Sequence, residues 1–265
     1  MGIFNQKRLF LKAIIVICIL LLFHFIFAKK LTKENIENKI TQTVEKIGQT
    51  TTEVKTSLSR QVAPTQSETE GLSQHLIETA FVQQAPEKNW DQPWQDACEE
   101  ASLIIVDYFY KNTKSISIIE NRDALLKMIE FENNQGFTHD TNIEQMSLVA
   151  QKYLGYQTKI IENPTVEDIK KYLIQNIPIV VTANGKTLYE ENKHFNSGGP
   201  YYHSLVILGY DDNKKQFIVH DVGTKAGAYF KYSYDLLMES IHDFPESGKK
   251  EDINNGPKRV LILLK

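Results

Sequence analysis

Residues 202–211 read YHSLVILGYD, and residues 216–222 read QFIVHDV. Both runs are rich in β-branched and aromatic residues, and the polar sequence DDNKK at 211–215 between them is typical of a turn. We therefore predict two strands joined as an antiparallel hairpin. In this hairpin, residues whose numbers sum to about 424–426 lie opposite one another, which brings His203 close to Asp221.

The segment at 98–111 reads CEEASLIIVDYFYK and is apolar nearly all round, as a central buried helix would be. Further helices are expected at residues 123–132, 142–154, 165–176 and 234–241. Strands are expected at residues 177–183, 204–210, 216–222 and 259–264. Two helices follow capping-box patterns, Thr141 with Glu144 and Thr165 with Asp168. Because helices come first and strands later, the order favours an α+β fold over repeated βαβ units.

Three residue types in these elements point to nucleophilic catalysis. Cys98 opens the buried helix, where the positive end of the helix dipole favours thiolate over thiol. His203 enters its strand from a Gly/Pro loop at 197–200, so the imidazole is held by the sheet beside solvent. Asp221 on the partner strand can accept from one imidazole nitrogen and fix the tautomer. A thiol, a base and a group that orients the base are what cysteine catalysis requires.

The order Cys, His, Asp resembles that of papain-like peptidases. More narrowly, the chain resembles cysteine peptidase family 39 and its stand-alone relatives, which are papain-like domains first known from bacteriocin exporters. The resemblance covers about residues 78–265. It is carried by three segments, namely Gln84-Ala85-Pro86, Asp96-Ala97-Cys98-Glu99-Glu100-Ala101-Ser102, and His203 to Asp211 with Asp221 following.

The resemblance implies an α+β, papain-like fold with an N-terminal helical half and a C-terminal antiparallel sheet. It implies that Cys98 is the nucleophile, that His203 acts first as general base and then as general acid, and that Asp221 orients His203. A glutamine before the cysteine would donate to the oxyanion together with the Cys98 backbone N–H. We assign this role to Gln84, with Gln95 and Gln92 as alternatives nearer the cysteine.

Two departures from the family bear on activity. Glu99 and Glu100 follow Cys98, where the bacteriocin-exporter members usually carry glycine. Their carboxylates suit the helix dipole, but they would weaken thiolate formation if they pointed at the sulfur. The chain also lacks a GxxxxGK[ST] motif, so a transporter ATPase and a double-glycine leader substrate are not implied.

Residues 13–28 read AIIVICILLLFHFIFA and form an almost wholly apolar run. With residues 9–11 the run reaches about 20 residues, enough for a helix that spans a bilayer core of about 30 Å. The sequence Ile26-Phe27-Ala28 matches a small-x-small cleavage site poorly. We therefore favour an uncleaved, single-pass anchor over a cleaved signal or a buried helix, with the rest of the chain outside the cytoplasm.

Three parts of the chain are expected: a cytoplasmic tail and anchor at 1–28, a polar stalk or linker at 29–74, and a peptidase-like domain at 75–265. Within the stalk, helical spacing gives a narrow apolar stripe of Ile36, Ile40, Val44 and Ile47. This stripe fits a short coiled coil that would make a stalk-mediated oligomer, and it equally fits a loosely helical tether.

The composition narrows the function further. The 265 residues are 42% hydrophobic and 24% charged, which is ordinary for a globular protein and excludes wholly disordered or collagenous classes. Two cysteines exclude a disulfide scaffold and a four-cysteine zinc site, and no cofactor or metal is predicted. The net charge of −3 gives no case for a nucleic-acid partner.

The sequence therefore predicts a membrane-anchored, extracytoplasmic cysteine hydrolase that acts on a peptide or protein amide through a thioester. If an amine resolves the acyl-enzyme, the enzyme is a transpeptidase. The alternative is a catalytically inactive binding module of the same fold, displayed on a membrane stalk.

Overall fold

The structure is a computed structural model, and it describes residues 72–137 and 139–265. The predicted membrane segment at 13–28 lies outside the described residues, as do residues 29–71 of the stalk or linker predicted at 29–74. The described residues belong to one compact unit. Among the helices of the described part, none combines the length and apolar character needed to cross a bilayer.

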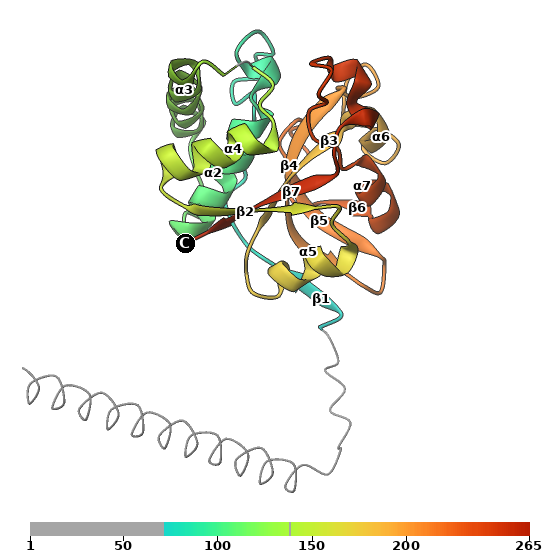
Figure 1. Cartoon of the computed structure of the whole chain (residues 1–265). Coiled ribbons are helices and arrows are strands. Elements are labelled where there is room, and N and C mark those ends of the chain that lie inside the picture. Colours follow the sequence, from blue (N-terminus) through green and yellow to red (C-terminus); the bar gives the residue numbers. More distant parts are fainter. Residues whose placement is uncertain (1–71, 138) are drawn as a thin grey trace, which may run out of the picture. The chain divides into compact units, whose positions relative to one another are not determined.

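A seven-stranded antiparallel sheet forms the centre of this unit (Figure 1). The strands are β1 (Gln74–Leu76), β2 (Gln157–Glu162), β3 (Ile179–Asn184), β4 (Tyr202–Asp211), β5 (Gln216–Asp221), β6 (Phe230–Ser233) and β7 (Arg259–Leu264). Their order is β2-β7-β3-β4-β5-β6, and β1 pairs with β4. Every residue of β3 and β4 is buried, so the predicted hairpin strand at 204–210 is the middle of the core. The expected α+β class with an antiparallel sheet is confirmed.

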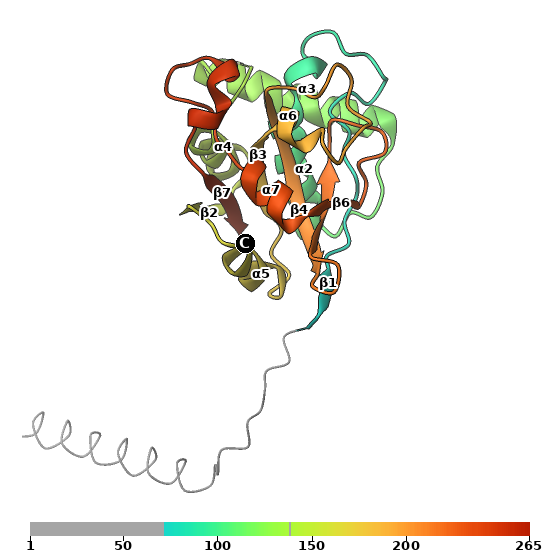
Figure 2. The same ribbon diagram turned by 90° about the vertical axis from the view of Figure 1, so that its right-hand side faces the viewer.

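Helices cover the sheet on two sides. They are α2 (Cys98–Tyr110), α3 (Ile118–Gln135), α4 (Ile143–Val149), α5 (Val166–Leu173), α6 (Gly185–Leu188) and α7 (Tyr234–Ser240). Short 3₁₀ turns lie at Trp94–Asp96 and Lys250–Asn255, and a π-helical turn at Ala150–Leu154 extends α4. Helix α2 packs against β3 and β4, and α7 lies on the opposite side of the sheet (Figures 1 and 2).

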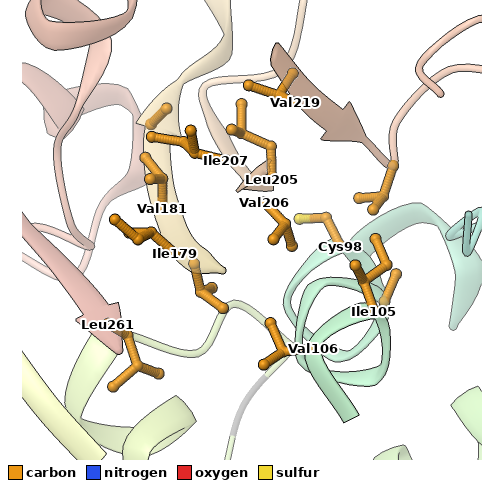
Figure 3. Packing of buried hydrophobic residues seen from close by; sticks show 14 of the residues in the cluster. Cys98, Ile105, Val106, Ile179, Val181, Leu205, Val206, Ile207, Val219 and Leu261 are labelled. Atoms are coloured by element: carbon orange, nitrogen blue, oxygen red, sulfur yellow. The ribbon is translucent and has the colours of Figure 1, made fainter. Parts of the chain in front are cut away.

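Helix α2 is the central buried helix that the sequence predicts. All ten residues from Cys98 to Asp107 are buried, because the segment has no polar face to turn toward water. Its one hydroxyl in this stretch is satisfied internally: Ser102 Oγ donates to Cys98 O at 2.8 Å and accepts from Ser204 Oγ on β4 at 2.9 Å. Figure 3 shows Cys98 at the start of α2 with its sulfur directed toward β4, near Val206. The nucleophile is thus fixed by core packing.

Capping boxes start helices α4 and α5, one at the predicted residue and one a residue later. The Thr165–Asp168 capping box before α5 is confirmed, with both reciprocal bonds present. The box before α4 lies one residue later than predicted: Asn142 caps the helix and Gln145 closes the box. Asparagine is a better N-cap than threonine, so the pattern that begins at Asn142 prevails.

Helix α3 begins at Ile118, five residues before the predicted start at 123. A capping box between Ser117 and Glu120 starts it, and Gly136 ends it in the left-handed conformation. Ile118 and Ile119 in the first turn are each 59% exposed, so these apolar side chains do not contribute to the core.

Near Asp221 the register of the β4–β5 hairpin lies at the upper end of the predicted range, since paired residue numbers sum to 426, and beside the turn they sum to 427. Asp221 lies opposite Leu205, not directly opposite His203. The pairing shifts by one residue at an irregularity between Ile207 and Gly209, which the sequence does not show. Because His203 and Leu205 are two residues apart on one strand, their side chains share a face, and Asp221 remains a diagonal neighbour of His203.

Candidate active site

The His203 imidazole and the Asp221 carboxylate are in direct contact. His203 Nε2 lies 2.9 Å from Asp221 Oδ1, and both side chains are almost fully buried. His203 Nδ1 forms no hydrogen bond with the described residues. The carboxylate therefore holds the imidazole by Nε2 and leaves Nδ1 for another partner.

Asp221 accepts hydrogen bonds on both oxygens. Gly223 N donates to Oδ1 at 3.2 Å, while Tyr232 OH at 2.6 Å and Asn192 Nδ2 at 2.9 Å donate to Oδ2. Burial alone would raise the pKa of Asp221, but the charge and hydrogen bond of His203, with these other donors, lower the pKa below its ordinary value. Asp221 is therefore an ionised group inside the protein.

Close packing fixes the imidazole ring. Phe195 meets His203 edge-on, with ring centroids 5.1 Å apart. On another side, a Cβ at Gly223 would lie 2.7 Å from His203 Cε1 and 2.9 Å from Phe195 Cε1, so a side chain at this position would displace one of the rings. Sequence reasoning missed Gly223, Phe195, Asn192 and Tyr232, and no local motif marks them.

Cys98 begins α2 and is 5% exposed. Its thiol donates to Glu99 Oε2 at 2.9 Å. Burial raises the pKa of the Cys98 thiol well above its ordinary value, and the charge and hydrogen bond of Glu99 raise it further. The negative charges of Glu100 and Asp140 act in the same direction. These effects oppose the lowering that a helix N-terminus alone would give, so the resting thiol is protonated.

Cys98 and His203 line one cavity of about 740 Å³. Trp90 and Tyr201, both more than 40% exposed, also line it, and they add aromatic surface. Lys250 lines the same cavity, with Nζ 3.7 Å from Asp96 Oδ1 and 3.5 Å from Asp140 Oδ2. The cavity is large enough for several residues of an extended peptide.

A scan against family models matches residues 77–249 to the Peptidase_C39 like family. The chain belongs to this family. Among solved structures, the C39-like chain is similar to one described as a putative C39-like peptidase from Bacillus anthracis, at 16% identity and a TM-score of 0.45. That match covers 72% of this chain and 98% of the other. No curated protein matches the sequence. Family membership points to a cysteine peptidase-like function, and it does not by itself establish activity.

Gln84 occupies a buried position in this C39-like domain, at the cavity wall. Its Nε2 donates to Trp94 O and to Gln95 O, each at 3.1 Å, so both amide hydrogens are bound to the turn that precedes Cys98. Gln95 also lines the cavity and is exposed. Gln92 lies outside the cavity lining and donates to Asp96 Oδ2 at 2.5 Å. The oxyanion role of Gln84 stays a prediction.

The second histidine on the hairpin, His220, is separate from the C39-like site. Its Nε2 lies 3.3 Å from Thr79 O, and its Nδ1 accepts from Tyr229 N at 3.1 Å. Burial lowers the pKa of His220 to about 4, so the imidazole is neutral at ordinary pH. His220 thus ties two chain segments to β5.

Proposed function

We propose that the chain is a membrane-anchored cysteine peptidase that works outside the cytoplasm. One observation carries the proposal: Cys98 and the bonded pair His203–Asp221 line a single cavity in a member of the C39-like family. The cavity and its aromatic rim fit a peptide or protein substrate. The apolar run at 13–28 supports the anchor.

The geometry supports a general-base mechanism. Because Asp221 engages Nε2 of His203, Nδ1 is the nitrogen that takes the thiol proton as Cys98 attacks the carbonyl. The resulting imidazolium returns the proton to the leaving amine, and a thioester remains on Cys98. Water then hydrolyses the thioester, or a second amine resolves it in transpeptidation. The Cys98 N–H would donate to the oxyanion, and Gln84 can join only by giving up one of its present bonds.

One observation favours the alternative, a binding module without activity. The Cys98 thiol is hydrogen-bonded to Glu99, a carboxylate that resists thiolate formation. A protein of this kind would hold peptides in the cavity without cleaving them. The two functions are separated by cleavage assays on the purified full chain.

The test uses the full chain in detergent and a mixture of synthetic peptides of varied sequence, analysed by mass spectrometry. We expect fragments from the wild type, none from Cys98→Ala, and at least about a hundredfold less from His203→Ala. His242→Asn is the matched control, because His242 lies outside the cavity and Asn can still donate to Gly256 O. Equal fragments from wild type and Cys98→Ala would refute the peptidase. Retention of peptides without cleavage would support the binding module.

The location is tested separately on cells that produce the full chain. An anchored protein stays with membranes after alkaline carbonate washing, and protease added outside intact cells digests the domain. Release by carbonate, or complete protection in intact cells, would contradict the proposed location. Crosslinking before extraction tests the stalk-mediated oligomer in the same samples.

A further inference from the structure

The residue next to the nucleophile holds the reacting sulfur. Glu99 Oε2 accepts the Cys98 thiol hydrogen bond at 2.9 Å, and Glu99 Oε1 accepts from Thr141 N at 3.2 Å. The Glu99 side chain is completely buried, and none of the ion pairs among the described residues involves it. A carboxylate in this position is fixed by the fold on one side and by the nucleophile on the other.

Most titratable groups around Glu99 are acidic, and the basic one is Lys250, which pairs with Asp140 at 3.5 Å and interacts with the charge of Cys98. Glu100 lies next to it on α2, Asp140 precedes α4, and Glu132 on α3 also experiences its charge. Tyr202 on β4 faces both Glu99 and Cys98. Burial raises the pKa of Glu99 first, and the charges of Glu100 and Asp140 raise it further. Burial and these negative charges disfavour a charge on either group. Ionisation of both the Cys98 thiol and the Glu99 carboxyl at the same time is therefore strongly opposed.

We propose that Glu99 restrains the nucleophile: its carboxylate holds the proton on the Cys98 sulfur and must release the thiol before His203 can accept that proton. The proton balance is simple. In the resting pair the sulfur carries the proton and Glu99 is the acceptor. In the active arrangement the same proton lies on His203 Nδ1, and the Glu99 carboxylate, still ionised, has turned its Oε2 away from the thiolate. This inference rests on the proposed function of Cys98 and His203.

The opposite role would give Glu99 the thiol proton as a second base. The two roles predict opposite effects of Glu99→Gln. If Glu99 restrains the thiol, the neutral amide removes a repelling charge and can donate to the thiolate, which becomes more accessible. If Glu99 is a base, the variant loses its proton acceptor and reacts more slowly.

The experiment follows iodoacetamide alkylation of the full chain from pH 4 to 10, with peptide mass spectrometry to separate Cys98 from Cys18. We expect the midpoint for Glu99→Gln to fall by at least one pH unit, which makes alkylation at pH 7 about tenfold faster than in the wild type. The two profiles should converge toward acid, where Glu99 is protonated. An unchanged or raised midpoint overturns the proposal.

Asp107→Asn is the matched control, because it makes the same chemical change at a buried acid of the same helix that contacts Lys111 and Tyr156 and not the sulfur. Its profile should superimpose on that of the wild type. If Glu99→Gln fails to fold, the S–H stretching band of a Cys18→Ser chain decides: a carboxylate acceptor shifts this band to lower wavenumber, and a band at the free-thiol position overturns the proposal. His203→Ala tests the proposed function and not the role of Glu99. If this variant is alkylated and cleaves as fast as the wild type, the proposed function is contradicted. The direction of the Glu99→Gln effect would be the same in either case.

Discussion

At the scale of single residues, Asp221 shows how the fold keeps a charge inside the protein. A buried carboxylate is costly unless donors replace the water that it loses. Here four donors do so, from β4, β6, the turn after β5 and the segment at Asn192. The charge of Asp221 therefore depends on residues far apart in the sequence.

Tyr232→Phe tests this dependence, since it removes the shortest hydrogen bond to Asp221. We expect a loss of about 1.5–3 kcal/mol in the free energy of unfolding, measured in urea, as for a hydrogen bond to a charged group. The pKa of Asp221 should rise toward its ordinary value, which moves the acid limb of the cleavage-rate profile to higher pH. Tyr229→Phe is the control, because its hydroxyl binds the Thr79 backbone instead. An acid limb that stays in place would contradict the role of Tyr232 as a positioning residue.

At the scale of elements, the pairing of β1 with β4 depends on one small residue. His75 and Leu76 lie against Gly209, and a Cβ at that position would collide with the His75 carbonyl oxygen. Beyond β1, Ile77 N donates to Leu208 O at 2.8 Å. The chain therefore enters the domain along β4, and it can do so only because residue 209 has no side chain.

Gly209→Ala should separate β1 from β4. We expect the free energy of unfolding to fall by about 1–3 kcal/mol, the usual cost of overpacking. Hydrogen exchange of the Ile77 amide should accelerate more than that of amides in β3. Leu76→Ala, which shortens a 44% exposed side chain in the same strand, should change both quantities little. Unchanged exchange at Ile77 in Gly209→Ala would show that the strand accommodates the methyl group.

At the scale of the whole molecule, the sequence predicts best what is buried. The runs at 98–111 and 259–264 are mostly apolar, and the structure has an element at each. Strand β2 reads QTKIIE and is half-exposed, so its sequence has no clear strand pattern and does not predict it. Its extended conformation depends on pairing with β7. In the site, spacing and hairpin register place His203 beside Asp221. The contacts of Asn192 and Tyr232, and the rotamer that aims Glu99 at the sulfur, depend on tertiary packing that no local pattern encodes.

Two buried acidic residues on neighbouring helices should make the stability of the domain depend on pH. Glu100 on α2 and Glu132 on α3 are both buried, and each has one carboxyl oxygen without a hydrogen-bond partner among the described residues. The two carboxyls interact, so a proton shared between them would stabilise the folded state. Burial raises the pKa of Glu132 to about 7, and it raises the pKa of Glu100 well above its ordinary value. The folded protein therefore binds more protons than the unfolded chain between about pH 4.5 and 7.

The free energy of unfolding should accordingly be highest in mild acid and fall as the pH rises through about 7. A shift of this size corresponds to roughly 3 kcal/mol for one carboxyl as an upper bound. Below pH 4 the opposite sign applies, because the pKa of Asp221 is lowered and its contribution is lost as the pH falls. Urea titrations of the full chain at pH 5, 6, 7 and 8 measure the slope. Glu132→Gln should flatten it, because an amide can donate to Glu100 without a shared proton. A slope equally steep in that variant would assign the pH dependence to another group, with Glu99 the first to examine because its pKa is raised in the same direction.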